Sequence, residues 1–167
     1  MAALLTGSLR LCSVFVIVLA ASAFGSGRSV FADFIDGLAA YDSGQLRDAY
    51  EEWLPLAEAG DLQAQVALAG LLQVGGRGMD RDLPAAAAWY RRAAERGDPV
   101  AQMNLGDLYA EGQGVERDLV QAVAWLSLAA EQGRLWAAQR RAALVGSLSE
   151  TQLRAADALS ARLRRDE

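Results

Sequence analysis

The chain has 167 residues, with 21 acidic residues against 16 arginines, no lysine, no histidine and one cysteine. These absences exclude Ser-His and Cys-His nucleophile pairs, histidine-ligated metals, a phosphate-loop lysine and a Schiff-base lysine. We therefore expect no catalytic residue, no cofactor and no metal, and we do not expect an enzyme. The acidic balance argues against nucleic acid or anionic lipid as the main partner.

An apolar run near the N-terminus, Leu11 to Ala23, follows a short segment whose one charge is Arg10. The run is shorter than the roughly 20 residues that a membrane-spanning helix needs, so residues 1–32 are predicted to be a secretory signal peptide. Small residues permit cleavage after Ala23 or after Ala32, and the sequence does not choose between the two sites. An uncleaved membrane anchor is the alternative.

Cleavage at the second site leaves a chain that begins at Asp33 and carries 14 arginines against 21 acidic residues, a net charge of −7. The remaining chain of about 135 residues is long enough for one domain with a core. It contains no cysteine, so export brings no disulfide framework. We expect a periplasmic or secreted protein with no membrane span after signal cleavage.

Residues 33–60 are predicted to form a helical hairpin that turns at Ser43 and Gly44. Gly60 ends the second helix, and Asp61 caps the helix that follows. The second helix of this hairpin carries its apolar side chains at helical spacing, at Leu46, Ala49, Tyr50, Trp53 and Leu56.

Most of the next stretch of sequence occurs twice, once in residues 61–97 and again in residues 98–133. Trp125, for example, follows Trp89 by 36 residues. A fixed period in the thirties is typical of stacked two-helix units, each of which cannot bury its apolar face without a neighbour. The two stretches are therefore predicted to be two helix hairpins of one stack.

Two capping boxes are predicted at helix starts. Asp118 has Gln121 three residues later, and Ser149 has Gln152 three residues later. In such a box the first side chain accepts from a backbone N–H of the first turn, and the second reaches back to the capping residue.

The repeated positions of the second unit form a long, multi-residue pattern: Ala101, Gln102, Leu105, Gly106, Leu108, Tyr109, the 112–115 loop, Asp118, Ala122, Trp125, Leu126 and the 129–133 segment. This pattern resembles the Sel-one-like repeat, an α/α relative of the tetratricopeptide repeat. The resemblance implies an all-α fold, a right-handed solenoid of about three helix hairpins. It also implies a role in protein–protein contact, often in bacterial envelope signalling or exopolysaccharide assembly.

Residues 134–167 are predicted to form a degenerate half-repeat followed by a C-terminal capping helix. The repeat pattern decays here, because Arg141 stands where the second unit has Leu105. We expect Trp136 to pack beneath the capping helix, since one end of a repeat stack must be covered. A docking aromatic is the alternative for this side chain.

In arrays of the tetratricopeptide type, the first helices of successive hairpins line the concave face. The positions there that do not repeat are candidates for partner binding. Asp107 and Glu111 lie four residues apart on one helix face. Our hypothesis is that this acidic pair meets a basic element of a partner; a merely solvated pair is the alternative. The candidate partner-binding residues are Val66, Gln73, Met103, Asp107 and Glu111, and the same phase also places Gly70, Val74 and Ala110 there.

The favoured reading is a monomeric, non-catalytic scaffold that binds a protein partner in the cell envelope. A membrane-anchored adaptor with an uncleaved N-terminus is one alternative. A hydrolase that acts on cell-wall material with carboxylates alone is another, and it would need two carboxylates flanking a cleft. Asp107 and Glu111 are the candidates for that pair.

Overall fold

The computed structural model describes residues 30–166, and this part of the chain folds into eight α-helices. The predicted signal peptide, residues 1–32, lies outside the described residues except for its last three, which begin the first helix. No helix of the described part is long and apolar enough to cross a membrane. The helices are α1 (Val30–Asp42), α2 (Leu46–Glu58), α3 (Leu62–Val74), α4 (Leu83–Ala94), α5 (Pro99–Glu111), α6 (Leu119–Glu131), α7 (Leu135–Val145) and α8 (Glu150–Asp166).

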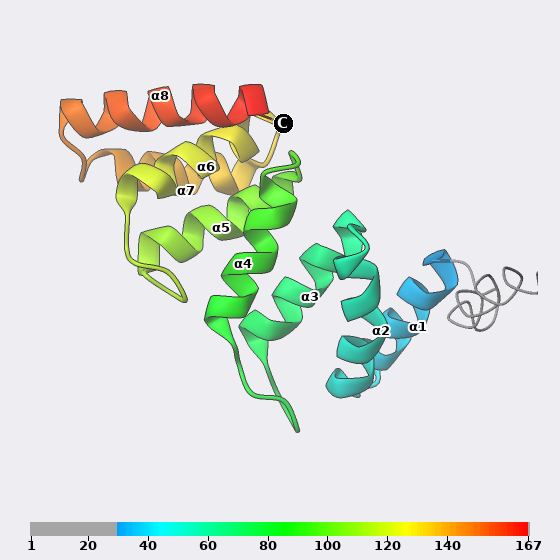
Figure 1. Cartoon of the computed structure of the whole chain (residues 1–167). Helices are drawn as coiled ribbons and strands as arrows, with labels where there is room; N and C mark the ends of the chain where they lie inside the picture. The colour runs from blue at the N-terminus through cyan, green and yellow to red at the C-terminus, as the bar shows by residue number, and fades with distance from the viewer. Residues whose placement is uncertain (1–29, 167) are drawn as a thin grey trace, which may run out of the picture.

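From α1 to α7, each helix packs against the next one along the chain, which builds an elongated stack of hairpins (Figure 1). The last helix departs from this order, because α8 lies along α6 and makes little contact with α7. The predicted all-α solenoid is confirmed.

The core runs through the stack as a chain of apolar clusters. One cluster contains Trp53 and Leu68, and the next contains Leu105 and Trp125, all with at most 3% of their surface exposed. Trp89 packs against both clusters and so joins neighbouring hairpins. Full burial of one leucine side chain, such as Leu68 or Leu105, stabilises the fold by about 1.5–3 kcal/mol. A hairpin needs its neighbour because that neighbour provides this burial.

Backbone carbonyls at the ends of the second helices receive one repeated hydrogen bond from the next hairpin. Gln65 Nε2 donates to the carbonyl oxygen of Ala57 at 3.0 Å, and 37 residues later Gln102 Nε2 donates to that of Ala94 at 3.3 Å. Both glutamines are buried. The repeat therefore fixes the register between hairpins with a polar contact as well as with apolar packing.

The two capping boxes differ. Ser149 and Gln152 form the complete box, because Ser149 N–H donates to Gln152 Oε1 at 2.9 Å and Gln152 N–H donates to Ser149 Oγ at 3.3 Å. Asp118 accepts from the N–H groups of residues 120 and 121 as expected. Its own N–H, however, donates to the carbonyl of Tyr109 at 3.0 Å, so the returning half of the Asp118–Gln121 box does not form.

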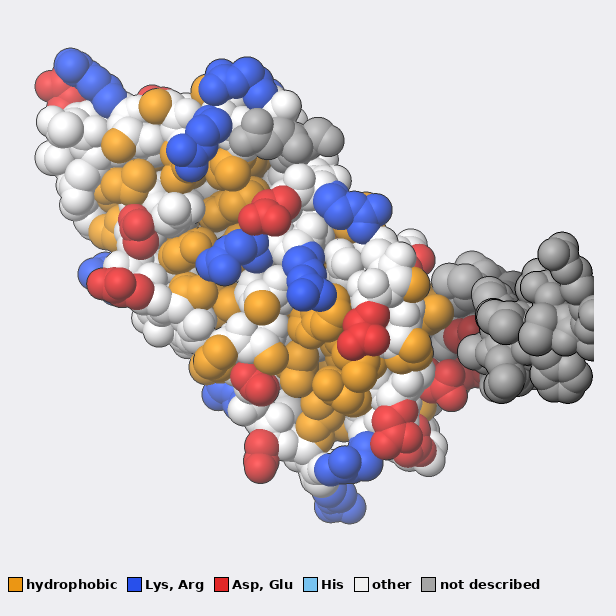
Figure 2. All heavy atoms as spheres, viewed as in Figure 1, with side chains coloured by type: hydrophobic (Ala, Val, Ile, Leu, Met, Phe, Trp, Pro, Cys, Tyr) orange, Lys and Arg blue, Asp and Glu red, His pale blue; other side chains and the backbone are white. Residues whose placement is uncertain are grey.

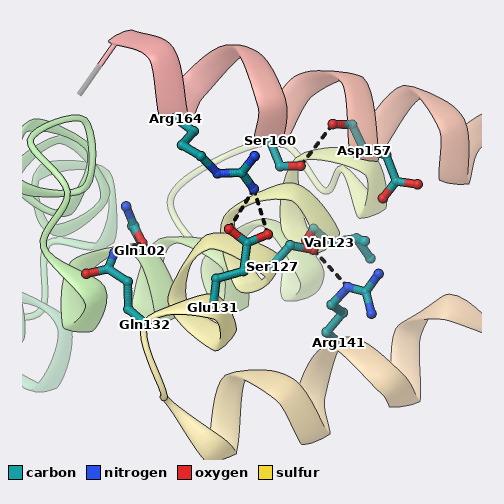
Figure 3. A network of polar contacts seen from close by, with 9 residues as sticks. All are labelled: Gln102, Val123, Ser127, Glu131, Gln132, Arg141, Asp157, Ser160 and Arg164. Carbon is teal, nitrogen blue, oxygen red and sulfur yellow. Dashed lines mark hydrogen bonds and ion pairs between the residues drawn. The ribbon is translucent and has the colours of Figure 1, made fainter.

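The C-terminal end is more open than the sequence predicts. Trp136 is 47% exposed, so the expectation that it packs beneath the capping helix is wrong. The reason is Arg141, whose Nε donates to Ser127 Oγ on α6 at 2.8 Å. Because the side chain at this repeat position is charged, α7 has no apolar surface there for α8 to pack against. Instead α8 packs on α6, which lies between α8 and α7 in Figure 3.

Candidate functional site

The first helices α5 and α7 lie on either side of an ion-pair bracket. Arg140 of α7 donates from Nε to Asp107 Oδ1 at 2.6 Å and from Nη2 to Glu111 Oε1 at 2.9 Å. The three side chains are between 26% and 42% exposed. The cation that the acidic pair was predicted to take from a partner is thus already supplied by the chain itself.

The bracket has a simple electrostatic origin. Two carboxylates one helical turn apart repel each other, and a planar guanidinium with several N–H donors can contact both at once. At this exposure the pairs contribute at most about 1 kcal/mol to stability. The bracket therefore organises a charged surface more than it holds the fold together, and a competing charged group could rearrange it.

Gln73 is held from two directions. Its Oε1 accepts a hydrogen bond from the Tyr90 hydroxyl at 3.0 Å, and its carbonyl oxygen accepts one from Arg81 Nε at 2.9 Å. Burial raises the pKa of Tyr90 to about 12, so this hydroxyl stays a donor at neutral pH. The Gln73 amide is consequently oriented by the protein, with its nitrogen available on the half-buried surface.

Val66 and Met103 are half-buried and contribute packing to this face. Val66 packs against the cluster around Leu105, and Met103 packs against the cluster of Leu126, Ala129 and Ala137. Ala110, which helical phase placed on the same surface, is only 6% exposed and belongs to the core.

Val74 of α3 is an exposed apolar side chain, with 65% of its surface accessible. It occupies in α3 the repeat position that Glu111 occupies in α5, and Gly70 likewise matches Asp107. One hairpin therefore presents a small apolar surface where the next presents the ion-pair bracket. Figure 2, which views the molecule as in Figure 1, shows the general pattern of apolar patches surrounded by side chains of both charges.

Sequence reasoning missed Arg140. The alignment that matches Arg141 with Leu105 also matches Arg140 with Asn104. That match places Arg140 on a first helix, but it does not say which side chains of two neighbouring first helices meet.

The described residues also form hollows away from this face. One, of about 580 Å³, lies between the 116–121 segment and α8, and neither Asp107 nor Glu111 lines it. A second, of about 380 Å³, lies among α6, α7 and α8 and is lined by Arg141 and Ser160, among others. The carboxylate pair proposed for hydrolysis is therefore on an open face and lies outside both hollows.

Known proteins share this sequence pattern and architecture. A family model described as Sel1 repeat matches residues 62–98 and 99–133. A Sel1 repeat protein from Oxalobacter formigenes is 35% identical, with 68% of this chain and 87% of that chain covered and a TM-score of 0.59. No curated protein matches the chain significantly.

A second solved structure is that of a protective antigen present in uropathogenic Escherichia coli strains, which displays an SLR fold. It is 32% identical, with a TM-score of 0.77 and 83% of this chain covered. This chain spans only 30% of the length of that protein.

Proposed function

Because this chain belongs to the Sel1 repeat family, whose members generally mediate protein–protein contacts, we propose that it is a non-catalytic scaffold of the bacterial cell envelope. It would hold one protein partner on the face formed by α3, α5 and α7, in a process such as envelope signalling or exopolysaccharide assembly. The observation that carries the proposal is the bracket of Arg140 with Asp107 and Glu111, together with the exposed Val74 at the repeat position in α3 that Glu111 occupies in α5.

This face combines the two features that recognition of a peptide segment needs. Val74 offers an exposed apolar side chain, and Glu111 offers the more exposed carboxylate of the bracket. Each carboxylate oxygen can accept two hydrogen bonds, so a basic group of the partner can join Arg140 on Glu111 without displacing it. Val66, Gln73 and Met103 would form the walls around the bound segment.

Export is supported by the apolar run Leu11 to Ala23 and its flanking residues. The similarity to a protective antigen is compatible with an exported protein. The test is N-terminal sequencing of the protein from a periplasmic extract. A first residue at 24 or 33 supports cleavage, whereas an intact N-terminus in the membrane fraction would favour the anchored adaptor.

Partner binding is tested by affinity capture from a periplasmic extract with the full chain as bait, followed by mass spectrometry. The first variant, Asp107→Arg with Glu111→Arg, reverses the acidic pair but sets three arginines side by side. The second adds Arg140→Glu, which restores an ion pair of opposite polarity and serves as the matched control for folding.

We expect one envelope protein to be captured by the wild type and lost from both variants. Loss from the first variant alone would mean that the ion-pair geometry matters and the sign of the pair does not. Equal capture by all three would place the binding surface elsewhere. Failure of the folded wild-type chain to capture any protein would contradict the scaffold proposal.

A further inference from the structure

Large apolar side chains are exposed mainly at the two ends of the described stack. On α1, Ile35, Leu38 and Tyr41 are 43%, 40% and 39% exposed. On α7, Leu135 and Trp136 are 72% and 47% exposed. The helices α1 and α7 lie toward opposite ends of the molecule (Figure 1), so the two surfaces are separate.

The α1 surface is the outer side of the first helix of the stack. Ile35 and Leu38 are three residues apart and so lie along one face of the helix, whereas the ring of Tyr41 lies against Trp53, with ring centroids 5.9 Å apart. The inner side of α1 is in contact with Trp53, through Phe34, whose ring centroid lies 5.9 Å from that of Trp53. In α3, α5 and α7, a preceding helix covers the first helix of each hairpin, and in the described part of the chain α1 has no such neighbour.

The α7 surface exists because α7 lacks its own second helix. Leu135 begins α7 as Leu62 begins α3, but Leu62 packs against the cluster of the following hairpin. Because α8 lies along α6, no described helix covers Leu135 in this way. Of the residues of α7, only Ala137 is buried.

The charges of the two surfaces are opposite. Helix α1 carries Asp33, Asp36 and Asp42 and no basic residue. Helix α7 and its N-cap carry Arg134, Arg140 and Arg141 and no acidic residue. Arg140 and Arg141 are engaged with α5 and α6, and Arg134 is exposed beside Leu135. Contact of α1 with α1, or of α7 with α7, would bring like charges together, whereas contact of α1 with α7 brings opposite charges together.

We propose that a second copy of this chain covers these surfaces, with α1 of one copy packed on α7 of the next. The contact is head-to-tail, so a joined pair still has one free α1 and one free α7. Further copies can therefore add, and chains of more than two copies form. A joint between single helices falls in the class of small interfaces, below about 1,200 Å² in total, and is expected to dissociate on dilution. This self-association would replace the monomer expected from the sequence, and it uses neither Asp107 nor Glu111.

The test is the weight-average mass of the purified full chain, measured by sedimentation equilibrium over a series of concentrations. One variant blocks α1 with Ile35→Gln and Leu38→Gln, and another blocks α7 with Leu135→Gln and Trp136→Gln. Glutamine is neutral and favours helix, so both variants lose apolar contact without a change of charge. The control is Val74→Gln, which changes an exposed apolar side chain that belongs to neither surface. Circular dichroism checks the helix content of each variant.

For the wild type and the control, we expect a mass that rises with concentration beyond two chains. Each blocked variant should associate at least about tenfold more weakly. An equimolar mixture of the two blocked variants should reach the mass of two chains and stop there, because only one intact pair of surfaces remains.

A wild-type mass of one chain at every concentration would overturn the proposal. Undiminished association of either blocked variant would also overturn it, because that result would show a contact between identical surfaces. Failure of the two blocked variants to pair in the mixture would overturn it as well. If a double variant loses helix content, the single changes Leu38→Gln and Leu135→Gln make the same comparison at exposed positions.

Discussion

Gly106 in α5 lies so close to Leu126 in α6 that a methyl group at position 106 would come within 2.8 Å of Leu126 Cγ. It would also come within 3.1 Å of the carbonyl oxygen of Ala122. Backbone atoms cannot move aside as a flexible side chain can. We therefore predict that Gly106→Ala destabilises the protein by about 1–3 kcal/mol, although alanine is the better helix former. Denaturant unfolding measures the change.

Gly70 in α3 provides the matched comparison. A methyl group there would meet only the Tyr90 hydroxyl oxygen, at 3.5 Å, which is an ordinary contact. Gly70→Ala should therefore stabilise the protein by up to about 1 kcal/mol, the usual gain from replacing a helix-interior glycine. Equal effects of the two substitutions would contradict the close approach of α5 to α6.

The two buried glutamines of the repeat should respond differently to replacement by methionine, which has a similar shape. Gln102 uses both ends of its amide, since Nε2 donates to the Ala94 carbonyl and Oε1 accepts from Gln132. Gln65 donates to Ala57, but its buried Oε1 has no hydrogen-bond partner. We expect Gln102→Met to cost about 1–3 kcal/mol and Gln65→Met clearly less, because the first removes two hydrogen bonds and the second removes one.

Thermal and chemical unfolding of both variants would show which substitution costs more stability. A larger loss for Gln65→Met would mean that the Ala57 carbonyl matters more than the unpaired oxygen.

Tyr90 should make the protein sensitive to alkaline pH. Burial raises its pKa to about 12 in the folded state, against about 10 in an unfolded chain. Below pH 10 the hydroxyl is protonated in both states and its contribution is intact. Above pH 10 the unfolded state loses the proton first, so the free energy of unfolding should fall by about 1.4 kcal/mol per pH unit until pH 12.

Tyr90→Phe is the control for this effect. Below pH 10 it should cost about 1 kcal/mol through the lost bond to Gln73. Above pH 10 this difference should shrink, because phenylalanine does not titrate and the variant loses less stability than the wild type. Denaturant midpoints at a series of pH values report both quantities. The effect of Tyr90 is easier to isolate in this protein because the chain has no lysine, which would otherwise titrate in the same pH range. The same alkaline slope in both proteins would show that Tyr90 is not its source.

The two capping sites predict a further contrast. Ser149→Ala should destabilise the protein by about 0.5–2 kcal/mol, because it removes the acceptor for the first-turn N–H of α8. Gln121→Ala should change stability by less than about 0.5 kcal/mol, because the N–H of Asp118 is bonded to Tyr109 and needs no side-chain partner. Both changes are measured by denaturant unfolding, and a large effect of Gln121→Ala would contradict the hydrogen bonding described for Asp118.

The sequence by itself determined the helices, most of their ends and the repeat, although α1 begins at Val30 and not at the predicted Asp33. Glycine after a helix end, aspartate before a helix start and apolar residues at helical spacing act over a few residues, so they can be recognised without knowledge of the rest of the fold. The 36-residue spacing of Trp89 and Trp125 then predicted that the hairpins stack. Of the candidate site, the sequence identified the first-helix face and its acidic pair.

Tertiary structure alone decided how the ends of the stack close and how the candidate site is charged. The apolar residues of α8 at helical spacing, Leu153, Ala156, Leu159 and Leu163, indicate that one of its faces is buried. They do not say whether α6 or α7 covers that face. Arg141 occupies the position on α7 where an apolar residue could have packed against α8, and α8 packs on α6. Likewise Arg140 meets Asp107 across 33 residues of sequence, a contact that depends on how two helices are placed and not on the pattern of either one.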